Sequence, residues 1–279
     1  MIHFIGIGAQ KSATSWVYAC LYEHPQICAP IKEIHFFSRP RYSEGIHSYE
    51  AHFKSCSEGS LHGEFSTSYL YAPEAPQRIF THYPEVKLIA ILRNPIDRAY
   101  SQYRNAIKAG EIHESVTFDT YRKDEESVLA QGLYRAQLDR YLQYFKREQI
   151  LILIQEDIAH DPVLFMKRIY EFLGVDASFV GSMVHDEINV ARTPKRIWIE
   201  RVMHHVAEFL RRQGLHAVVH AIRKWGFPDM VRSVNTKEGK ERTARDPYDR
   251  EELVSYFRED VTELSKLLER DLGKEWNIF

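Results

Sequence analysis

The sequence predicts an α/β protein built on a doubly wound parallel sheet, and three features carry this prediction. Nearly continuous apolar runs rich in Ile and Leu occur at residues 3–8, 87–93 and 149–155. Such runs are typical of strands that are buried on both faces. Segments with helical spacing lie between them, which favours right-handed crossovers. The chain has 279 residues, 44% of them hydrophobic, so it is long enough to bury a sizeable core.

Weaker patterns add two further strands, at residues 26–30 and 61–66. The expected helices of the core lie at residues 15–23, 72–83, 95–107, 133–145 and 161–174. Asn94 is a plausible N-cap with Pro95 in the first turn, and Gly174 suits a C-terminal cap. This order of elements predicts a sheet core over about residues 1–175.

The C-terminal third reads as mainly helical. Residues 196–225 are amphipathic, residues 233–249 form a polar, cationic loop, and residues 250–273 predict one long helix. We expect this part, over about residues 176–279, to pack on the sheet core, so that residues 1–279 form a single domain.

Composition excludes several classes of partner. The net charge is −2, which does not indicate a nucleic-acid partner, and no apolar run is long enough to span a bilayer. Three cysteines without CxxC spacing argue against a disulfide framework and a structural zinc site. Because the strand pattern begins at Ile2, no signal peptide is expected, and these features together predict a cytoplasmic protein. Residues 192–250 hold fourteen Lys or Arg against seven Asp or Glu, which fits either an anionic ligand or solvated helix faces.

The turn at residues 6–16 joins the first strand to the first helix and contains Lys11. Such a turn presents backbone N–H groups to an anion. The nucleotide triphosphate motif GxxxxGK[ST] fails here because Ile5 and Gln10 replace its glycines, and the dinucleotide motif GxGxxG fails at Lys11. The alternative is a polar helix N-terminus capped by Ser12 or Thr14.

Two segments resemble the donor-binding motifs of sulfotransferases that use 3′-phosphoadenosine 5′-phosphosulfate (PAPS). QKSATSW, at residues 10–16, resembles the 5′-phosphosulfate loop, with Ala13 where the family usually has glycine. LIAILRNPIDRAYSQY, at residues 88–103, resembles the 3′-phosphate motif through Arg93 and Ser101. Arginine binds phosphate bidentately, and a strand's carboxyl end delivers it to the ligand crevice. Taken singly, an arginine at a sheet edge and a helical serine are ordinary features.

A third segment, HGEFSTSYLYAPEAPQRIF at residues 62–80, is similar to the heparan-sulfate-type and related bacterial soluble sulfotransferases. In these enzymes a Glu after a strand is the catalytic base, and a Tyr follows. Glu64 and Tyr69 match, whereas Phe65 stands where the glycan enzymes often have Lys. Residues 24–37 resemble the family's His-Pro turn and its Lys-Glu-x-x-Phe-Phe segment.

The resemblance implies transfer of a sulfuryl group from PAPS to a hydroxyl or amine of a small-molecule or glycan acceptor, which leaves adenosine 3′,5′-bisphosphate. It implies Glu64 as base and Lys11 as the cation that neutralises the leaving phosphate, without a metal. The ring of Trp16, or that of another aromatic residue, is expected beside the adenine. The expected cofactor-binding residues are Lys11, Ser12, Ala13, Thr14, Ser15, Trp16, Arg93, Ser101, Lys237, Lys240 and Arg242.

Two other functions remain open on the sequence. A degenerate P-loop kinase or NTPase would need a magnesium-binding carboxylate where Arg93 stands, and a non-catalytic nucleotide-binding protein would need no base at Glu64. Residues 106–131 and 184–234 are expected to contact the acceptor. The basic C-terminal third favours an anionic one, and no pattern indicates an oligomeric state.

Overall fold

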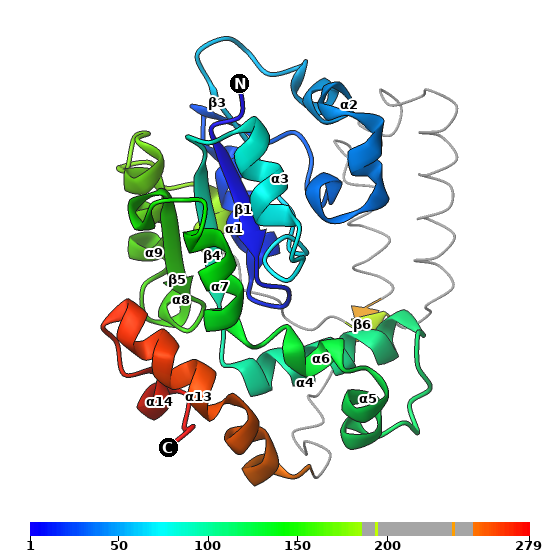
Figure 1. The fold of residues 1–279 in the computed structure, drawn as a ribbon. Helices are drawn as coiled ribbons and strands as arrows, with labels where there is room; N and C mark the ends of the chain where they lie inside the picture. Colours follow the sequence, from blue (N-terminus) through cyan, green and yellow to red (C-terminus); the bar gives the residue numbers. More distant parts are fainter. Residues whose placement is uncertain (186–192, 195–235, 238–247) are drawn as a thin grey trace. The chain divides into compact units, whose positions relative to one another are not determined.

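The computed structural model describes residues 1–185, 193–194, 236–237 and 248–279 (Figure 1). Its main sheet has five strands, all parallel, in the order β2–β3–β1–β4–β5. The five expected strands and the α/β fold are thereby confirmed. The strands are β1 Phe4–Gly8, β2 Ile27–Cys28, β3 Leu61–Phe65, β4 Lys87–Leu92 and β5 Ile150–Ile154.

The order of the strands defines where a ligand would bind. β2 and β3 lie on one side of β1, whereas β4 and β5 lie on the other. Open α/β sheets bind ligands beyond the carboxyl ends of the strands, at the point where the strand order reverses. In this sheet that point lies where β1 and β4 end.

Helices cover both faces of the sheet. α1 Thr14–Glu23 and α9 Pro162–Leu173 contribute to one buried cluster with apolar side chains of β1, β3, β4 and β5. α3 Ala75–His82 and α7 Tyr134–Leu142 lie on the opposite side in Figure 1. Because side chains alternate along a strand, Phe65 enters the α1 cluster whereas its neighbour Glu64 points to the other face.

The cap predictions are confirmed. Asn94 Oδ1 accepts the backbone N–H groups of Ile96 (3.0 Å) and Asp97 (3.3 Å) at the start of α4 Pro95–Ala109. Gly174 ends α9 with φ 83°, in the left-handed region that glycine adopts most easily. The other α-helices within residues 1–185 are α2 Ile46–Glu50, α5 Phe118–Asp124, α6 Ser127–Ala130 and α8 Asp157–His160.

The expected helix at residues 250–273 is wrong in its extent. α13 Arg250–Leu268 ends where Glu269 turns into the left-handed region at φ 51°. Asp271 then caps a second short helix, α14 Leu272–Glu275, by accepting the Lys274 N–H at 3.1 Å. The helix therefore ends at its local cap, although the helical spacing of the sequence continues to residue 273.

The cysteines also correct the sequence analysis, because Cys28 and Cys56 form a disulfide. Their separation of 28 residues matches no short motif. The chain leaves β2, passes through α2 and returns beside β2, which brings the two Cα atoms to 5.7 Å. Cys20 is a buried free thiol. The cysteines thus give no support for a reducing compartment.

The chain divides into two compact units: residues 1–102, 118–188 and 248–279 in one, and residues 103–117 and 189–247 in the other. In the second unit β6 Thr193–Pro194 pairs antiparallel with β7 Thr236–Lys237. The helix expected at residues 196–225 lies outside the described residues, and the single-domain assignment stays a prediction. None of the helices described is both long and apolar enough to cross a membrane.

Candidate active site

The loop that contains Lys11 turns sharply between β1 and α1. Lys11 (φ 68°) and Ala13 (φ 57°) both adopt the left-handed conformation. Ala13 occupies the N-cap position of α1, and no side chain caps this helix. The interpretation of Ser12 or Thr14 as a cap is therefore wrong. The helix N-terminus instead keeps the electrostatic character that attracts an anion.

Ser12 adds a polar group to this loop. It is fully buried, and its Oγ has no hydrogen-bond partner among the described residues. Buried hydroxyl groups nearly always have a partner, so an orphaned one calls for an explanation. Next to a helix N-terminus and a lysine, the arrangement fits an anionic group such as a phosphate. Thr14 is buried in the same turn, whereas Ser15 is exposed.

The second expected element meets the first at the sheet edge. Arg93 directly follows β4, and its Nη1 donates to the backbone carbonyl of Lys11 at 3.2 Å. Arg93 as a whole is half-buried. Ser101 lies about two turns into α4 and is also half-buried. Two cationic residues 82 positions apart thus converge where β1 and β4 end.

A third cation in this region was missed by the sequence analysis. Arg98, in the first turn of α4, is fully buried, donates to Gln102 Oε1 at 2.8 Å, and also donates to the carbonyl of Val128. Burial is the main cause that lowers its pKa, and the positive charge of Arg93 adds to this effect. The sequence offers only its place early in a helix, which is equally typical of an exposed arginine.

The structure places Trp16 in the core. Its indole is buried in the cluster between α1 and α9, and Nε1 donates to the Met183 carbonyl at 2.9 Å. Its backbone N–H donates to Ala13 at 3.0 Å. Trp16 is thus a core residue in this structure, and its expected contact with the adenine stays a prediction.

Glu64 differs from the expectation in its place and surroundings. It lies inside β3, opposite Ile5 of β1, and not after the strand. The carboxylate is fully buried, accepting from Ser66 Oγ at 2.7 Å and from the Tyr49 hydroxyl at 3.4 Å. Burial raises the pKa of Glu64 to about 7. A carboxyl group with this pKa is suited to proton transfer near neutral pH.

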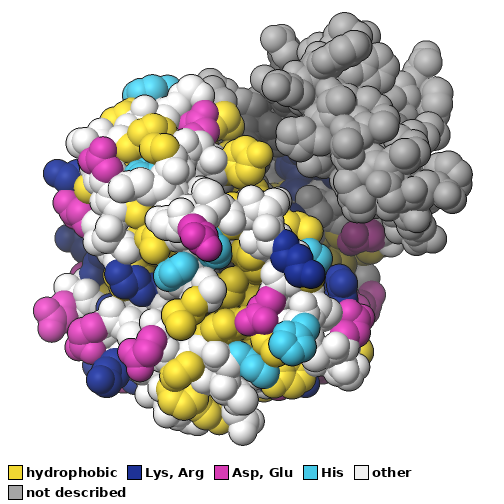
Figure 2. Space-filling model, turned by 90° about the horizontal axis from the view of Figure 1, so that it is seen from above, with side chains coloured by type: hydrophobic (Ala, Val, Ile, Leu, Met, Phe, Trp, Pro, Cys, Tyr) yellow, Lys and Arg dark blue, Asp and Glu magenta, His cyan; other side chains and the backbone are white. Residues whose placement is uncertain are grey.

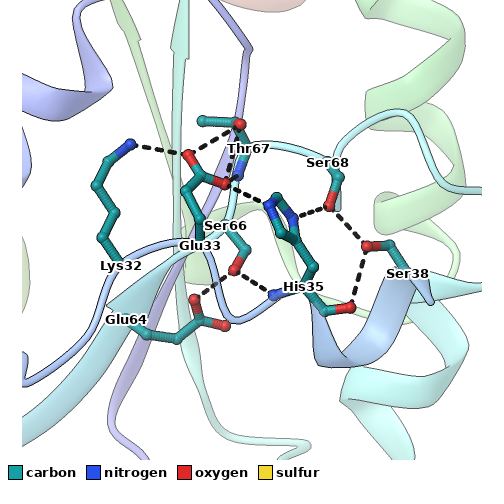
Figure 3. A network of polar contacts seen from close by, with 8 residues as sticks. All are labelled: Lys32, Glu33, His35, Ser38, Glu64, Ser66, Thr67 and Ser68. Atoms are coloured by element: carbon teal, nitrogen blue, oxygen red, sulfur yellow. Dashed lines mark hydrogen bonds and ion pairs between the residues drawn. The ribbon is translucent and has the colours of Figure 1, made fainter. Parts of the chain in front are cut away.

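Glu33 forms a second acidic centre beside Glu64 (Figure 3). Its carboxylate accepts from the Thr67 N–H (3.0 Å) and the Thr67 hydroxyl (3.1 Å), and it pairs with Lys32 Nζ (2.8 Å) and His35 Nε2 (3.2 Å). Its side chain is 29% exposed, whereas Glu64 is 0% exposed. The sequence match over residues 24–37 contained this residue but did not indicate its network.

Ser66 connects the two acidic centres. Its Oγ accepts the backbone N–H of His35 at 2.9 Å and donates to Glu64 at 2.7 Å (Figure 3). His35 Nδ1 lies 2.6 Å from Ser68 Oγ, and burial is the main cause that lowers the pKa of His35. The result is a continuous polar network from Lys32 to Glu64, in which the backbone N–H of His35 makes the link to Ser66.

The remaining expected cofactor cations are less informative. The backbone of Lys237 belongs to β7, whereas Lys240 and Arg242 lie outside the described residues. In the view of Figure 2, the described Lys and Arg side chains are interspersed with Asp and Glu. On the face in view, the mixed signs of charge do not point to a separate anion-binding patch.

Comparison with known proteins agrees with this geometry. Residues 2–213 match the family described as Sulfotransferase domain. A sulfotransferase from Alicyclobacillus acidocaldarius has a similar crystal structure, with a TM-score of 0.69 and 28% identity over 99% of both chains.

Curated relatives include two enzymes named for heparan sulfate. The mouse bifunctional heparan sulfate N-deacetylase/N-sulfotransferase 4 is 27% identical over 96% of this chain, which spans 30% of that protein's length. The human heparan sulfate glucosamine 3-O-sulfotransferase 6 is 31% identical over 61% of this chain and 51% of its own length. With the family match over most of its length, the chain belongs to the sulfotransferase domain family, the PAPS-dependent sulfotransferases.

Proposed function

We propose that this protein transfers a sulfuryl group from PAPS to a hydroxyl or amine of a small-molecule or glycan acceptor. The observation that carries the proposal is the contact between Arg93 and the Lys11 loop, because it joins two anion-binding elements at the reversal point of the sheet. The donor has two anionic ends, a 5′-phosphosulfate and a 3′-phosphate, which matches a site with two separate cationic elements.

The donor brings an activated sulfuryl group, and the residues of this chain hold it and manage charge. Lys11 and the backbone N–H groups of residues 12–15 would bind the 5′ end at the N-terminus of α1. The orphaned Ser12 hydroxyl fits this anion. Arg93 and Ser101 would bind the 3′-phosphate, with Lys237, Lys240 and Arg242 as further candidates for donor contacts. Lys11 would also neutralise the negative charge that develops as the bond to sulfur breaks.

Glu64 is our first candidate for the base that takes the acceptor proton. Its raised pKa keeps part of the carboxylate protonated near neutral pH, and Ser66 and Tyr49 fix its orientation. Glu33 is a second candidate, favoured by one observation: its carboxylate reaches the surface while that of Glu64 does not. Proton transfer requires the base to lie within hydrogen-bond reach of the acceptor.

The relatives guide the choice of acceptor. One is named as an N-sulfotransferase and the other as a 3-O-sulfotransferase of heparan sulfate. Both an amine and a hydroxyl of an amino sugar are therefore proposed acceptors, and a negatively charged glycan agrees with the basic residues of the C-terminal third. A small-molecule acceptor is the other class within the proposal.

The test is a transfer assay with labelled PAPS and a panel of acceptors: N-unsubstituted and N-acetylated heparan-type oligosaccharides, single amino sugars and phenols. Label transferred to any of them supports the proposal. A thermal-shift measurement accompanies it, because a ligand that binds the folded state raises the melting temperature. We expect adenosine 3′,5′-bisphosphate to stabilise strongly and ATP with magnesium to stabilise little. The reverse order would favour the NTPase alternative.

A cytoplasmic location remains part of the proposal, and the disulfide offers its test. A reducing compartment keeps Cys28 and Cys56 as thiols, whereas an oxidising one keeps them paired. Rapid acid quenching of cells followed by alkylation and mass spectrometry reads this state directly. Alkylated Cys28 and Cys56 are expected for a cytoplasmic enzyme, and an intact bond contradicts that location.

A further inference from the structure

We propose that the C-terminal segment, residues 270–276, is a positioning element that holds the 3′-phosphate end of the donor site in its binding geometry. The inference rests on the proposed function, since it takes Arg93 and Ser101 as the 3′-phosphate ligands. No residue of this segment is expected to touch the donor. Its effect would pass through Asn94, the residue between Arg93 and α4.

The segment is tied to the end of β5. Arg270 donates to both carboxylate oxygens of Asp157, at 2.7 and 2.6 Å, and Asp157 is the first residue of α8, three positions after β5 ends. The same guanidinium bonds both oxygens of Glu275, at 2.8 and 2.7 Å. Bidentate arginine–carboxylate pairs fix direction as well as distance. Arg270 therefore holds the start of α8 and the end of α14 together.

The segment is also tied to the end of β4. The backbone carbonyl of Trp276 accepts the Asn94 side-chain amide at 3.0 Å, a buried hydrogen bond across 182 positions of sequence. Trp276 itself is 2% exposed, with its indole edge-on to Tyr134 at 6.4 Å between ring centroids. The acceptor is thus anchored in the core.

Asn94 makes a hydrogen bond with each of its other groups. Its Oδ1 caps α4, and its backbone N–H donates to Glu156 Oε1 at 3.0 Å. The nitrogen and the oxygen of the side-chain amide are both hydrogen-bonded. The Trp276 carbonyl, which accepts from Nδ2, therefore selects the side-chain orientation that presents Oδ1 to α4. The C-terminal segment thereby helps set the start of the helix that carries Ser101 and the backbone that follows Arg93.

A segment that only stabilises the fold would not affect the 3′-phosphate more than the rest of the donor. The measured quantity is therefore the ratio of two dissociation constants, for adenosine 5′-phosphate over adenosine 3′,5′-bisphosphate, from calorimetry on the full chain. Asn94→Ser keeps an oxygen that caps a helix but is too short to reach Trp276. Arg270→Gln removes the bidentate contact with Asp157.

We expect the ratio to fall about fivefold in Asn94→Ser, the change typical of losing one neutral hydrogen bond, and by a similar or smaller factor in Arg270→Gln. Lys266→Gln is the matched control, because it breaks a surface ion pair with Glu263 on the neighbouring helix α13. It should leave the ratio unchanged. Urea unfolding of each variant establishes that the protein is folded; Asn94→Ser carries the test if Arg270→Gln fails to fold.

Arg93→Ala separates the two hypotheses. If Arg93→Ala collapses the ratio while folded Asn94→Ser keeps it, or if Asn94→Ser weakens both ligands equally, the positioning role is overturned and the proposed function stands. If Arg93→Ala leaves the ratio unchanged, the 3′-phosphate assignment fails and this inference fails with it.

Discussion

The guanidinium of Arg93 donates to the backbone carbonyl of Lys11 at 3.2 Å, so the ends of β4 and β1 are joined by a direct hydrogen bond. Lys11 sits in a left-handed turn, and Arg93 directly follows β4, which pairs with β1 on one side and β5 on the other. The bond therefore links the left-handed turn after β1 to the first residue after β4. It also brings the two expected anion-binding elements into a single site.

Arg93→Ala should weaken the binding of adenosine 3′,5′-bisphosphate by roughly 1.5–3 kcal/mol, the range for hydrogen bonds to charged groups. Arg93→Lys should recover part of this loss, because it keeps the charge but not the planar fork. The affinity for adenosine 5′-phosphate should change much less in both variants. Isothermal titration calorimetry measures all three, and equal losses for both nucleotides would remove Arg93 from the 3′-phosphate site.

Lys11→Ala should act on turnover more than on binding. The charge of Lys11 matters most when the leaving oxygen becomes negative, so kcat should fall by about 10²–10³, as for the loss of one preorganised donor. The dissociation constant of adenosine 3′,5′-bisphosphate should change by a smaller factor. Single-turnover kinetics with saturating donor gives the first quantity and calorimetry the second. Abolished binding with normal residual turnover contradicts the assignment.

Glu64→Gln should lower turnover by roughly 10²–10⁴, the share usual for general base catalysis. In the wild type kcat/KM should rise with pH around a midpoint near 7, because burial raises the pKa of Glu64 to about 7 and the base acts deprotonated. The Glu64→Gln variant should lose this rise, which forms the acidic limb of the pH profile. Glu33→Gln is the control, and it should keep the midpoint; if it removes the limb while Glu64→Gln retains it, the base is Glu33.

The same proton links Glu64 to stability. A carboxyl group whose pKa is higher in the folded state than in the unfolded state holds its proton more tightly when folded. Its favourable contribution is therefore complete below the unfolded value of 4.5 and is lost as the pH rises through about 7. Urea unfolding of the wild type should show this decline between these values, and Glu64→Gln should flatten it. An unchanged profile in the variant would contradict the raised pKa.

Breaking the Cys28–Cys56 disulfide should lower the free energy of unfolding by about 3–4 kcal/mol, the loop-entropy value for a span of 28 residues. The loop carries Glu33 and Tyr49, so the polar network around Glu64 should loosen as well. Guanidinium unfolding with and without a phosphine reductant measures the effect. The double variant Cys28→Ser/Cys56→Ser should show no further response to reductant, whereas a reductant-dependent shift in that variant would assign the effect elsewhere.

Ala13→Gly should be nearly neutral, within about 0.5 kcal/mol, although glycine usually destabilises. Relief of a left-handed alanine gains about 1–2 kcal/mol, which offsets the added chain entropy of glycine and the lost buried methyl group. Ala19→Gly, inside α1, is the matched control and should cost about 1 kcal/mol. Equal losses at both positions in thermal unfolding would show that Ala13 carries no left-handed strain.

Much of the fold could be predicted because its signals are local. The five strands were readable from apolar runs, the start of α4 from Asn94 and Pro95, and the end of α9 from Gly174. The Lys11 loop and Arg93 could be placed at one edge because parallel strands bring their carboxyl ends together. In each case a few neighbouring residues carry the information, and the sheet topology does the rest.

Other features required contacts that only the tertiary structure creates. The sequence offers Glu64 as a carboxylate, but its burial, its pKa and its Tyr49 partner arise because α2 folds over β3. The indole of Trp16 is a core group because α9 packs against α1. The disulfide and the bond from Asn94 to Trp276 join residues 28 and 182 positions apart. No local pattern records such pairs, since their proximity depends on the path of the whole chain between them.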